Sequence, residues 1–164
     1  MTKIFAGRYT AQTDAPFVVF LIGMRINRLR AIRKWLPVAS AMGPMISTLM
    51  QHPEKGLLHA ETFVRWREIV MVQYWRSYEQ LEAFARNRDD PHLPAWQAFS
   101  KAVGGDGSVG IWHETYQVHP GQHEAIYGNM PRFGLAAAAD HLTVSEARAT
   151  SRERMQAAGA RELP

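Results

Sequence analysis

The sequence predicts an α+β protein of the ferredoxin-like type, with a four-stranded antiparallel sheet, and two observations lead to this expectation. Its segments follow the order strand, helix, strand, strand, helix, strand, which is the split βαβ pattern. The strand segments 17–24 and 69–72 are apolar on both faces, so both faces of the sheet must be covered. Helices cover one face. We expect a second copy of the chain to cover the other, giving a homodimer that forms a dimeric α+β barrel.

The length of 164 residues fits one domain with additions. The polar residues 1–15 are expected to form a loosely held N-terminal arm. Residues 16–134 are expected to form the ferredoxin-like α+β-barrel domain. Residues 135–164 are rich in Ala, Arg and Glu and are expected to form a peripheral C-terminal helix or tail.

The first half of the predicted domain reads as a strand followed by a long helical pattern. The short β-branched and aromatic run 17–24 predicts a central strand. Apolar residues then recur at helical spacing from Leu29 to Met50, with Asn27 as the expected cap. Pro37 is expected to kink this helix or to begin a second one. The segment 52–56 contains Pro and Gly and predicts the end of the helix.

The second half reads as a hairpin, a helical region and a last strand. Segments 57–64 and 68–75, joined by a short polar turn, predict an antiparallel hairpin. Ser77 and Gln80 form a capping-box pattern for the next helix, and Pro94 begins a further helical turn. Segment 109–118 predicts the last long strand, and segment 124–127 a short strand that pairs back.

The last strand carries the candidate catalytic residues, His113 and Glu114. Neighbouring strand residues point to opposite faces, so these two cannot form a hydrogen-bonded pair with each other. Trp112, Glu114 and Tyr116 share one face, and their mixed apolar and polar character is typical of a ligand site. The face with His113 resembles a surface packed on helices. Only one of the two faces can line a pocket, and the sequence leaves open which.

Each catalytic candidate has a structural alternative. His113 is alternatively a hydrogen-bonded histidine of the core. Glu114 in the middle of an apolar strand needs a partner, for which Arg65, Arg76 and Arg132 are candidates. Without such a cation, a dry pocket raises the pKa of a carboxyl group, and Glu114 could then act as a general acid or base. That chemistry suits deprotonation of an electron-rich phenol or enol, whose carbanion then reduces oxygen.

Aromatic and polar side chains are expected to bind an apolar or aromatic small-molecule substrate. They are Trp75, Trp112, Tyr116, Tyr127, Asn129 and Arg132. The last three lie in the segment 127–134, which is either a lid over the pocket or a structural crossover that wraps the partner subunit.

No cofactor is expected. The absence of cysteine excludes thiolate metal sites, and the seven histidines show no HxH or HExxH spacing that would favour a metal centre built from several histidines. Haem needs only one axial ligand and is the alternative cofactor. His113 is then the metal ligand, with His92 and His59 as the other candidates.

Charge and hydropathy bear on partners and location. The net charge is +4, and the one basic cluster, at 25–34, is expected to be a solvated helix face, so no nucleic acid is expected. The longest apolar run covers residues 16–24, far short of the roughly 20 residues that span a bilayer. We therefore expect no contact with a membrane and a cytoplasmic protein.

Several strings resemble known families. The run 72–77, followed by Leu81 and by His92-x-x-Ala95-Trp96, resembles the dimeric α+β-barrel superfamily, which includes the antibiotic-biosynthesis monooxygenases. The string 109–116, with the segments 126–131 and 134–135, resembles a bacterial and fungal family called monooxygenase-like, whose fungal members include the fumagillin-cluster monooxygenase. The resemblance covers about residues 15–140.

The resemblance implies a monooxygenase-like enzyme that acts on an apolar or aromatic substrate in a barrel pocket. Superfamily relatives that bind haem, such as the aldoxime dehydratases, imply the alternative of a haem enzyme of dehydratase or peroxide type. A non-enzymatic module that binds small ligands is the third reading.

Overall fold

The computed structural model describes residues 2–90, 92–145 and 148–159, and it contains a four-stranded antiparallel sheet with strand order β3-β4-β2-β5. β2 (Phe17–Ile26) and β4 (Glu68–Trp75) are the central strands. β3 (Leu57–Arg65) and β5 (Val109–Val118) form the edges. The ferredoxin-like α+β fold expected from the sequence is therefore confirmed, with the doubly apolar segment 17–24 at the centre of the sheet.

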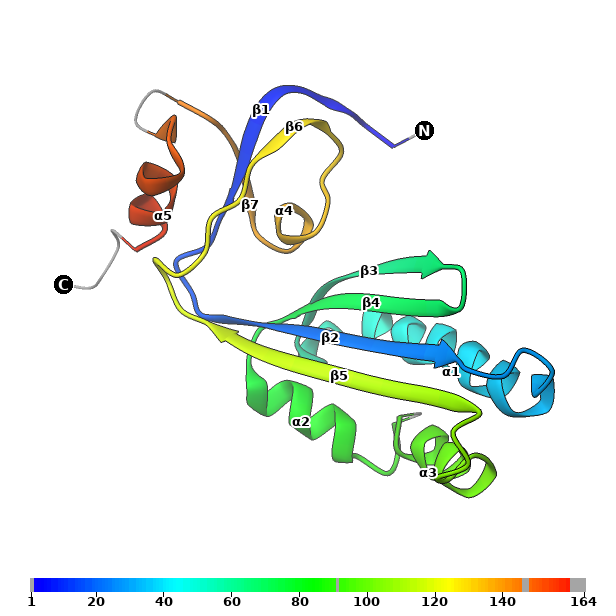
Figure 1. The fold of residues 1–164 in the computed structure, drawn as a ribbon. Helices are drawn as coiled ribbons and strands as arrows, with labels where there is room; N and C mark the ends of the chain where they lie inside the picture. The colour runs from blue at the N-terminus through cyan, green and yellow to red at the C-terminus, as the bar shows by residue number, and fades with distance from the viewer. Residues whose placement is uncertain (1, 91, 146–147, 160–164) are drawn as a thin grey trace.

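Three helices cover one face of this sheet, as Figure 1 shows. They are α1 (Ile32–Gln51), α2 (Tyr78–Arg86) and α3 (His92–Ala102). Leu49 of α1 and Phe84 of α2 pack with Trp75 of β4 in the main core cluster. Burial of these large apolar side chains is the main force that holds the helices to the sheet.

The first helix differs from the expected one. It begins at Ile32, and Ala31 rather than Asn27 is the residue before its first turn. Asn27 is instead part of the preceding loop, where its backbone N–H donates to the carbonyl oxygen of Ser108 at 3.1 Å. The helix also continues through Pro37 and Pro44, although a proline removes one helical donor. It ends at the expected place, before the 3-10 turn η1 (Pro53–Lys55).

The second helix begins as the sequence predicts. The Ser77 hydroxyl accepts a hydrogen bond from the backbone N–H of Gln80 at 3.2 Å. The side chain of Gln80 does not complete the capping box, because it donates instead to the carbonyl oxygen of Glu54 at 2.9 Å. This bond ties the start of α2 to η1.

The N-terminal segment is not a loose arm. Residues Phe5–Gln12 form β1, which pairs antiparallel with β6 (Tyr127–Met130) and β7 (Asp140–Thr143) in a second, three-stranded sheet. The ring of His141 stacks on that of Tyr9 at 4.4 Å, which fixes β7 against β1. The short strand expected at 124–127 therefore begins only at its last residue, and its partner is β1.

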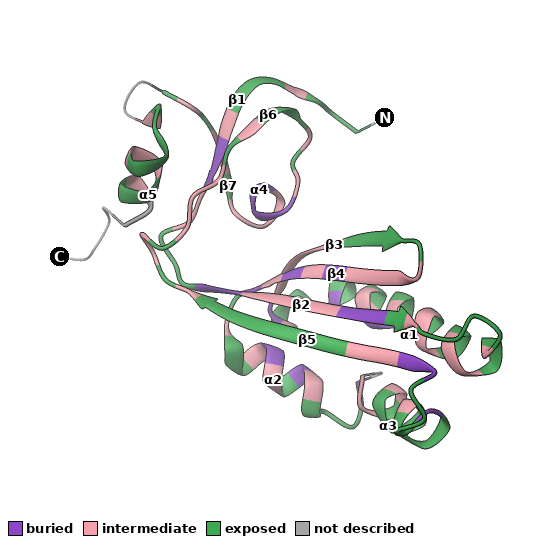
Figure 2. Ribbon diagram, in the orientation of Figure 1, coloured by how far each residue is buried: buried purple, intermediate pink, exposed green. Residues whose placement is uncertain are grey.

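The small sheet and α4 (Leu135–Ala138) cover one end of the face that the helices leave open. Phe17 of β2 packs there with Leu135 and Ala136. The expectation that the chain leaves this whole face bare is therefore wrong at this end. The small sheet that covers it is built from strands near both ends of the chain. The rest of the face stays open, and Figure 2 shows β5 exposed along most of its length.

The last element among the described residues is α5 (Ser151–Gly159), which contacts β1. The side chain of Gln12 donates to the carbonyl oxygen of Ala157 at 3.1 Å. Residues 146–147 and 160–164 of the expected tail lie outside the described residues. Apart from the N-terminal segment, which forms β1, the proposed division of the chain into domain and tail remains a prediction.

Candidate functional site

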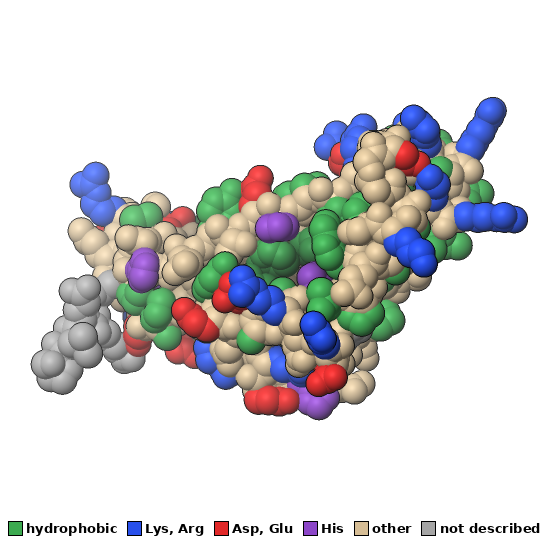
Figure 3. All heavy atoms as spheres, turned by 90° about the horizontal axis from the view of Figure 1, so that it is seen from below, with side chains coloured by type: hydrophobic (Ala, Val, Ile, Leu, Met, Phe, Trp, Pro, Cys, Tyr) green, Lys and Arg blue, Asp and Glu red, His purple; other side chains and the backbone are tan. Residues whose placement is uncertain are grey.

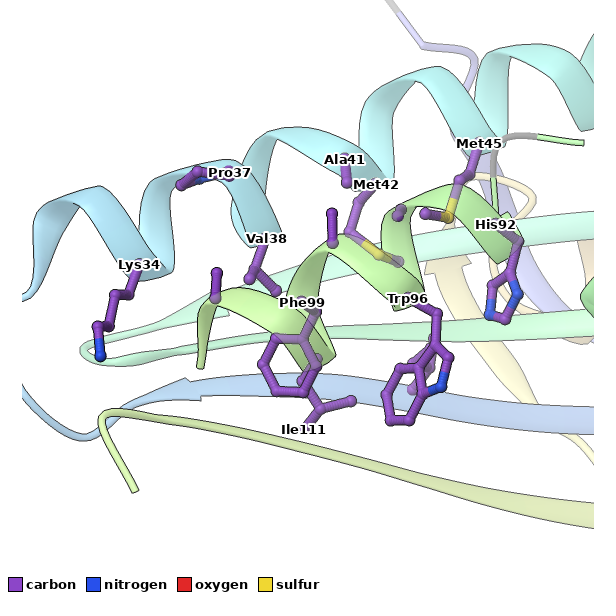
Figure 4. A pocket seen from close by; sticks show the side chains of 14 residues that line it. Lys34, Pro37, Val38, Ala41, Met42, Met45, His92, Trp96, Phe99 and Ile111 are labelled. Carbon is purple, nitrogen blue, oxygen red and sulfur yellow. The ribbon is translucent and has the colours of Figure 1, made fainter. Parts of the chain in front are cut away.

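A cavity of about 350 Å³, called the helix-side cavity below, lies between α1, α3 and the sheet. Figure 4 shows side chains of the two helices pointing toward the strands. The space-filling view of this face in Figure 3 is hollowed near its middle, with hydrophobic side chains in the hollow. The lining consists of Ile22, Lys34, Pro37, Val38, Ala41, Met42, Met45, His92, Ala95, Trp96, Ala98, Phe99, Ala102 and Ile111. Lys34 and His92 are the two ionisable side chains among them, so the cavity suits an apolar ligand.

His92 is the first residue of α3, and a hydrogen bond selects the tautomer of its neutral imidazole. Nδ1 lies 3.0 Å from the carbonyl oxygen of Ala85, at the end of α2. A carbonyl oxygen only accepts, so Nδ1 carries the proton and Nε2 of the neutral ring keeps a lone pair. The ring also packs on Phe84, with centroids 6.2 Å apart. His92 therefore presents a proton acceptor at a largely apolar cavity.

The link between α2 and α3 is held by a buried ion pair. Both carboxylate oxygens of Asp90 accept hydrogen bonds from Lys55 Nζ, at 2.7 and 2.9 Å. Asn87 Nδ2 donates to the same carboxylate at 3.0 Å. Asp90 is 5% exposed, so its carboxylate is well shielded from water. Since Asp90 stands just before α3, this pair helps to fix where His92 enters the cavity.

The predicted set Trp112, Glu114 and Tyr116 lies on the opposite, open face of the sheet and lines none of the helix-side cavity. Tyr116 donates a hydrogen bond of 2.6 Å from its hydroxyl to Glu114 Oε2. The carboxylate stabilises the protonated phenol and so raises the pKa of Tyr116. None of the three arginines expected as partners is ion-paired with Glu114 in the part of the chain that the structure describes. Tyr116, two residues along the same strand, takes that place.

The position of Trp112 depends on a glycine. Gly23 is paired with Trp112 across β2 and β5. A Cβ atom at residue 23 would lie only 2.5 Å from Trp112 Nε1. The missing side chain therefore lets the indole ring of Trp112 come close to the backbone at Gly23.

His113 lies on the face that carries the helices, so its separation from Glu114 is confirmed. Its ring packs on Phe20 of β2, with centroids 5.6 Å apart. Ile111, two residues earlier, lines the cavity, whereas His113 is exposed and does not. His113 is therefore neither a buried residue of the core nor part of the cavity wall.

Trp75, one of the predicted substrate-binding residues, is part of the core. It is 1% exposed, and its indole N–H donates to Gln73 Oε1 at 2.9 Å. It packs with the core helices and does not line the helix-side cavity.

Two of the three remaining predicted substrate residues, Tyr127 and Asn129, make hydrogen bonds at the small sheet. The hydroxyl of Tyr127 accepts a hydrogen bond from the backbone N–H of Ala136 at 3.2 Å, and burial raises its pKa. Asn129 has a positive φ of 53°, and its Oδ1 accepts from the backbone N–H of Gly7 at 2.9 Å. Arg132 is exposed. The structure thus places the segment 127–134 against β1 and the open face rather than at the helix-side cavity.

A second cluster of polar groups lies between β3 and α4. His59 Nε2 and Glu61 Oε1 are 2.8 Å apart, and the same carboxylate oxygen accepts from the backbone N–H of Gly134 at 3.3 Å. His59, a haem candidate from the sequence, is therefore engaged away from the helix-side cavity. Within the described ranges, no three His, Asp or Glu side chains are grouped so that they could hold a metal ion. No helix in these ranges has the length and apolar character needed to cross a membrane.

Comparison with protein families gives one match. The sequence model of the family described as monooxygenase af470-like matches residues 17–135. Comparison with curated protein sequences gives no significant match.

Several solved structures have a similar fold. An aldoxime dehydratase is 15% identical, with a TM-score of 0.65 over 84% of this chain and 44% of that one. The chain therefore spans less than half the length of the dehydratase, and the likeness shows a shared fold. SnoaB, a cofactor-independent oxygenase from Streptomyces nogalater, is 12% identical, with a TM-score of 0.45 over 64% of this chain and 95% of that one. A dimeric ferredoxin-like protein of unknown function from a Jannaschia species is 15% identical, with a TM-score of 0.41 over 60% and 97%.

Proposed function

Because this chain belongs to the monooxygenase af470-like family, we propose that it is a small-molecule monooxygenase whose apolar or aromatic substrate binds in the helix-side cavity. The observation that carries the proposal is the combination of an apolar cavity with one imidazole whose Nε2 keeps its lone pair. Apolar walls favour the substrate and exclude water, and His92 supplies the general base.

The proposed reaction needs oxygen as its one co-reactant. His92 Nε2 takes a proton from an acidic C–H group of an electron-rich substrate. The resulting carbanion reduces O₂, and a C–O bond forms to give a hydroperoxide. The O–O bond then breaks, with loss of water, and leaves a carbonyl group. The balance is CH₂ plus O₂ to C=O plus H₂O, so the substrate supplies all four electrons.

The homodimer predicted from the sequence remains part of the proposal. The uncovered end of the open face carries half-buried Val70, Val72 and Leu21 beside Trp112, which is 38% exposed. A second copy related by twofold symmetry would bury this strip. Glu114 and Tyr116 would then lie in the interface, whereas His113 lies on the helix side of the sheet. The sequence-based assignment of Glu114 and His113 as acid or base can be tested by substituting each residue separately.

A haem enzyme is the second candidate, and His92 is the residue that favours it. In the neutral tautomer that the bond to Ala85 selects, Nε2 has a lone pair that could bind iron, and the ring lines an apolar cavity. His113 and His59 do not line that cavity. His92 would hold the iron, in a cavity whose apolar walls include Val38, Met42 and Phe99. Bound haem would supply redox or Lewis-acid chemistry at the same site.

Oxygen uptake with anthrone, an apolar tricyclic substrate, tests the proposal. The purified protein should consume one O₂ per anthrone without added cofactor, and His92→Gln should lose most of this activity. Uptake that appears only after haem is added, together with a Soret band, would favour the haem enzyme. Binding of anthrone without uptake under either condition would favour the non-enzymatic ligand-binding module and overturn the proposal.

A further inference from the structure

The helix-side cavity is elongated, and its two ionisable side chains stand at opposite ends. Along α1, the lining runs from Lys34 to Met45, which at the helical rise is about 16 Å. His92 lies at the Met45 end, and Figure 4 shows both it and Lys34 pointing toward the sheet. The lining between them is apolar except for the indole N–H of Trp96. A ligand that fills the cavity therefore meets a base at one end and an ammonium group at the other.

Lys34 is held at its end of the cavity by a fixed acidic partner. Its Nζ is ion-paired with Asp106 Oδ2, in the turn that follows α3. The other oxygen of Asp106 accepts from the backbone N–H of Ser108 at 2.8 Å, which anchors the carboxylate to the chain. An ammonium group has three N–H donors, and this ion pair uses one of them. Lys34 is thus positioned and can still donate to a ligand.

The surroundings of Lys34 are strongly basic. Arg28, Arg30 and Arg33 are exposed, and none of them is in an ion pair within the described ranges. The first turn of α1 also contains no acidic residue. In Figure 3, Lys and Arg side chains gather toward one end of the hollowed face. The field of several positive charges therefore outweighs that of Asp106 and favours an anion at this end.

We propose that the substrate is an elongated apolar acid. Its anionic group, a carboxylate, enolate or phenolate, binds Lys34 at one end of the cavity, and its reacting carbon faces His92 at the other. This rests on the proposed function, since it takes the helix-side cavity as the substrate site. It adds a residue, Lys34, that sets both the charge and the direction of the bound substrate.

Two matched fluorescent probes test the proposal. One is the extended anilinonaphthalenesulfonate, whose sulfonate lies at the far end of the rings from the anilino group. The other is its uncharged parent, phenylnaphthylamine. The wild-type protein should bind the sulfonate more tightly than the parent. Lys34→Gln should weaken sulfonate binding about tenfold, as expected for the loss of one charge-assisted hydrogen bond, and should leave the affinity for the parent unchanged. Lys101→Gln, an exposed lysine of α3 outside the cavity lining, is the matched control.

A cavity-filling variant tests the location of the binding site separately from the role of Lys34. Ala41→Phe should abolish binding of both probes, and Ala83→Phe, on the exposed side of α2, should not. One possible result is that both probes bind the wild type, that Ala41→Phe blocks both, and that Lys34→Gln changes neither. This result would overturn the proposal that Lys34 binds the anionic group, but it would keep the helix-side cavity as the binding site. If Ala41→Phe blocks neither probe, the helix-side cavity itself is the wrong site.

Discussion

His92 Nδ1 and the carbonyl oxygen of Ala85 lie 3.0 Å apart, and this one hydrogen bond determines which imidazole nitrogen is available to a substrate. It joins the first residue of α3 to the last turns of α2. The base of the proposed reaction is therefore set by the packing of two helices and not by a neighbouring acid.

Replacing His92 with Gln should lower kcat for anthrone oxidation by about 10²–10⁴-fold, because a general base typically contributes that much. Binding of anthrone, measured by fluorescence quenching, should change little, since Gln keeps the side chain polar and of similar size. His119→Gln, on the exposed turn after β5, is the control and should retain full activity. A His92→Gln enzyme with normal kcat would remove His92 from the mechanism.

The buried Lys55–Asp90 pair should matter for stability. Asp90→Ala leaves the ammonium of Lys55 without its partner, and we expect the free energy of unfolding to fall by about 2 kcal/mol. That is less than for a fully buried pair, because the Lys55 side chain is 23% exposed. Urea denaturation measures the change. Asp89→Ala, at the exposed neighbouring position, should change stability by less than about 0.5 kcal/mol. Equal effects of the two substitutions would contradict the structural role of Asp90.

His123, in the segment that joins the two sheets, should make the protein less stable in acid. Burial lowers its pKa in the folded state, and the backbone of His119 opposes this only in part. In the unfolded chain this imidazole then binds a proton near the ordinary histidine pKa of about 6.5, while in the folded chain His123 is still neutral at that pH. Stability should therefore decrease as the pH falls through this range and be unaffected above it.

Thermal melting between neutral and mildly acidic pH measures this dependence. His123→Gln should flatten the acid side of the stability curve, and His119→Gln should leave it as in the wild type. Identical pH profiles for His123→Gln and wild type would show that another group governs the loss of stability.

The proposed dimer predicts a specific effect of charge on the open face. Val72→Lys places an ammonium group in the uncovered strip and should convert a dimer to a monomer in multi-angle light scattering. Val64→Lys, at a position of β3 that is 78% exposed, should stay dimeric. Thermal melting of both variants shows whether they are folded. A wild-type protein that is monomeric at all concentrations would contradict the dimer.

The sequence predicted the four-stranded sheet well because its signals are local. The doubly apolar run 17–24 indicates a central strand, and the alternation along β5 assigns Trp112 and His113 to opposite faces. The small sheet gives no such signal. Two of its strands, β6 and β7, have only four residues each, and Phe5 of β1 pairs with Met130, far away along the chain. Pairing over that separation leaves no periodicity in either segment alone.

The candidate site was less predictable than the fold for a similar reason. The cavity forms where α1 and α3 meet over the sheet, and this packing depends on side chains from four separate elements. In the sequence, His92 is one of three haem candidates and part of a motif that resembles the superfamily, and neither marks it as a base. Its bond to Ala85 and its position across the cavity from Lys34 arise from tertiary structure. The cluster on β5 is conspicuous in sequence, but it lies on the other side of the sheet.

A crystal structure of the protein with bound anthrone tests the central claim most directly. We expect the ring system between α1 and α3, with a ring carbon within contact distance of His92 Nε2. Electron density for the ligand over Trp112 and Glu114, with the helix-side cavity empty, would contradict the claim that the substrate binds beside His92. The active site would then lie on the open face of the sheet.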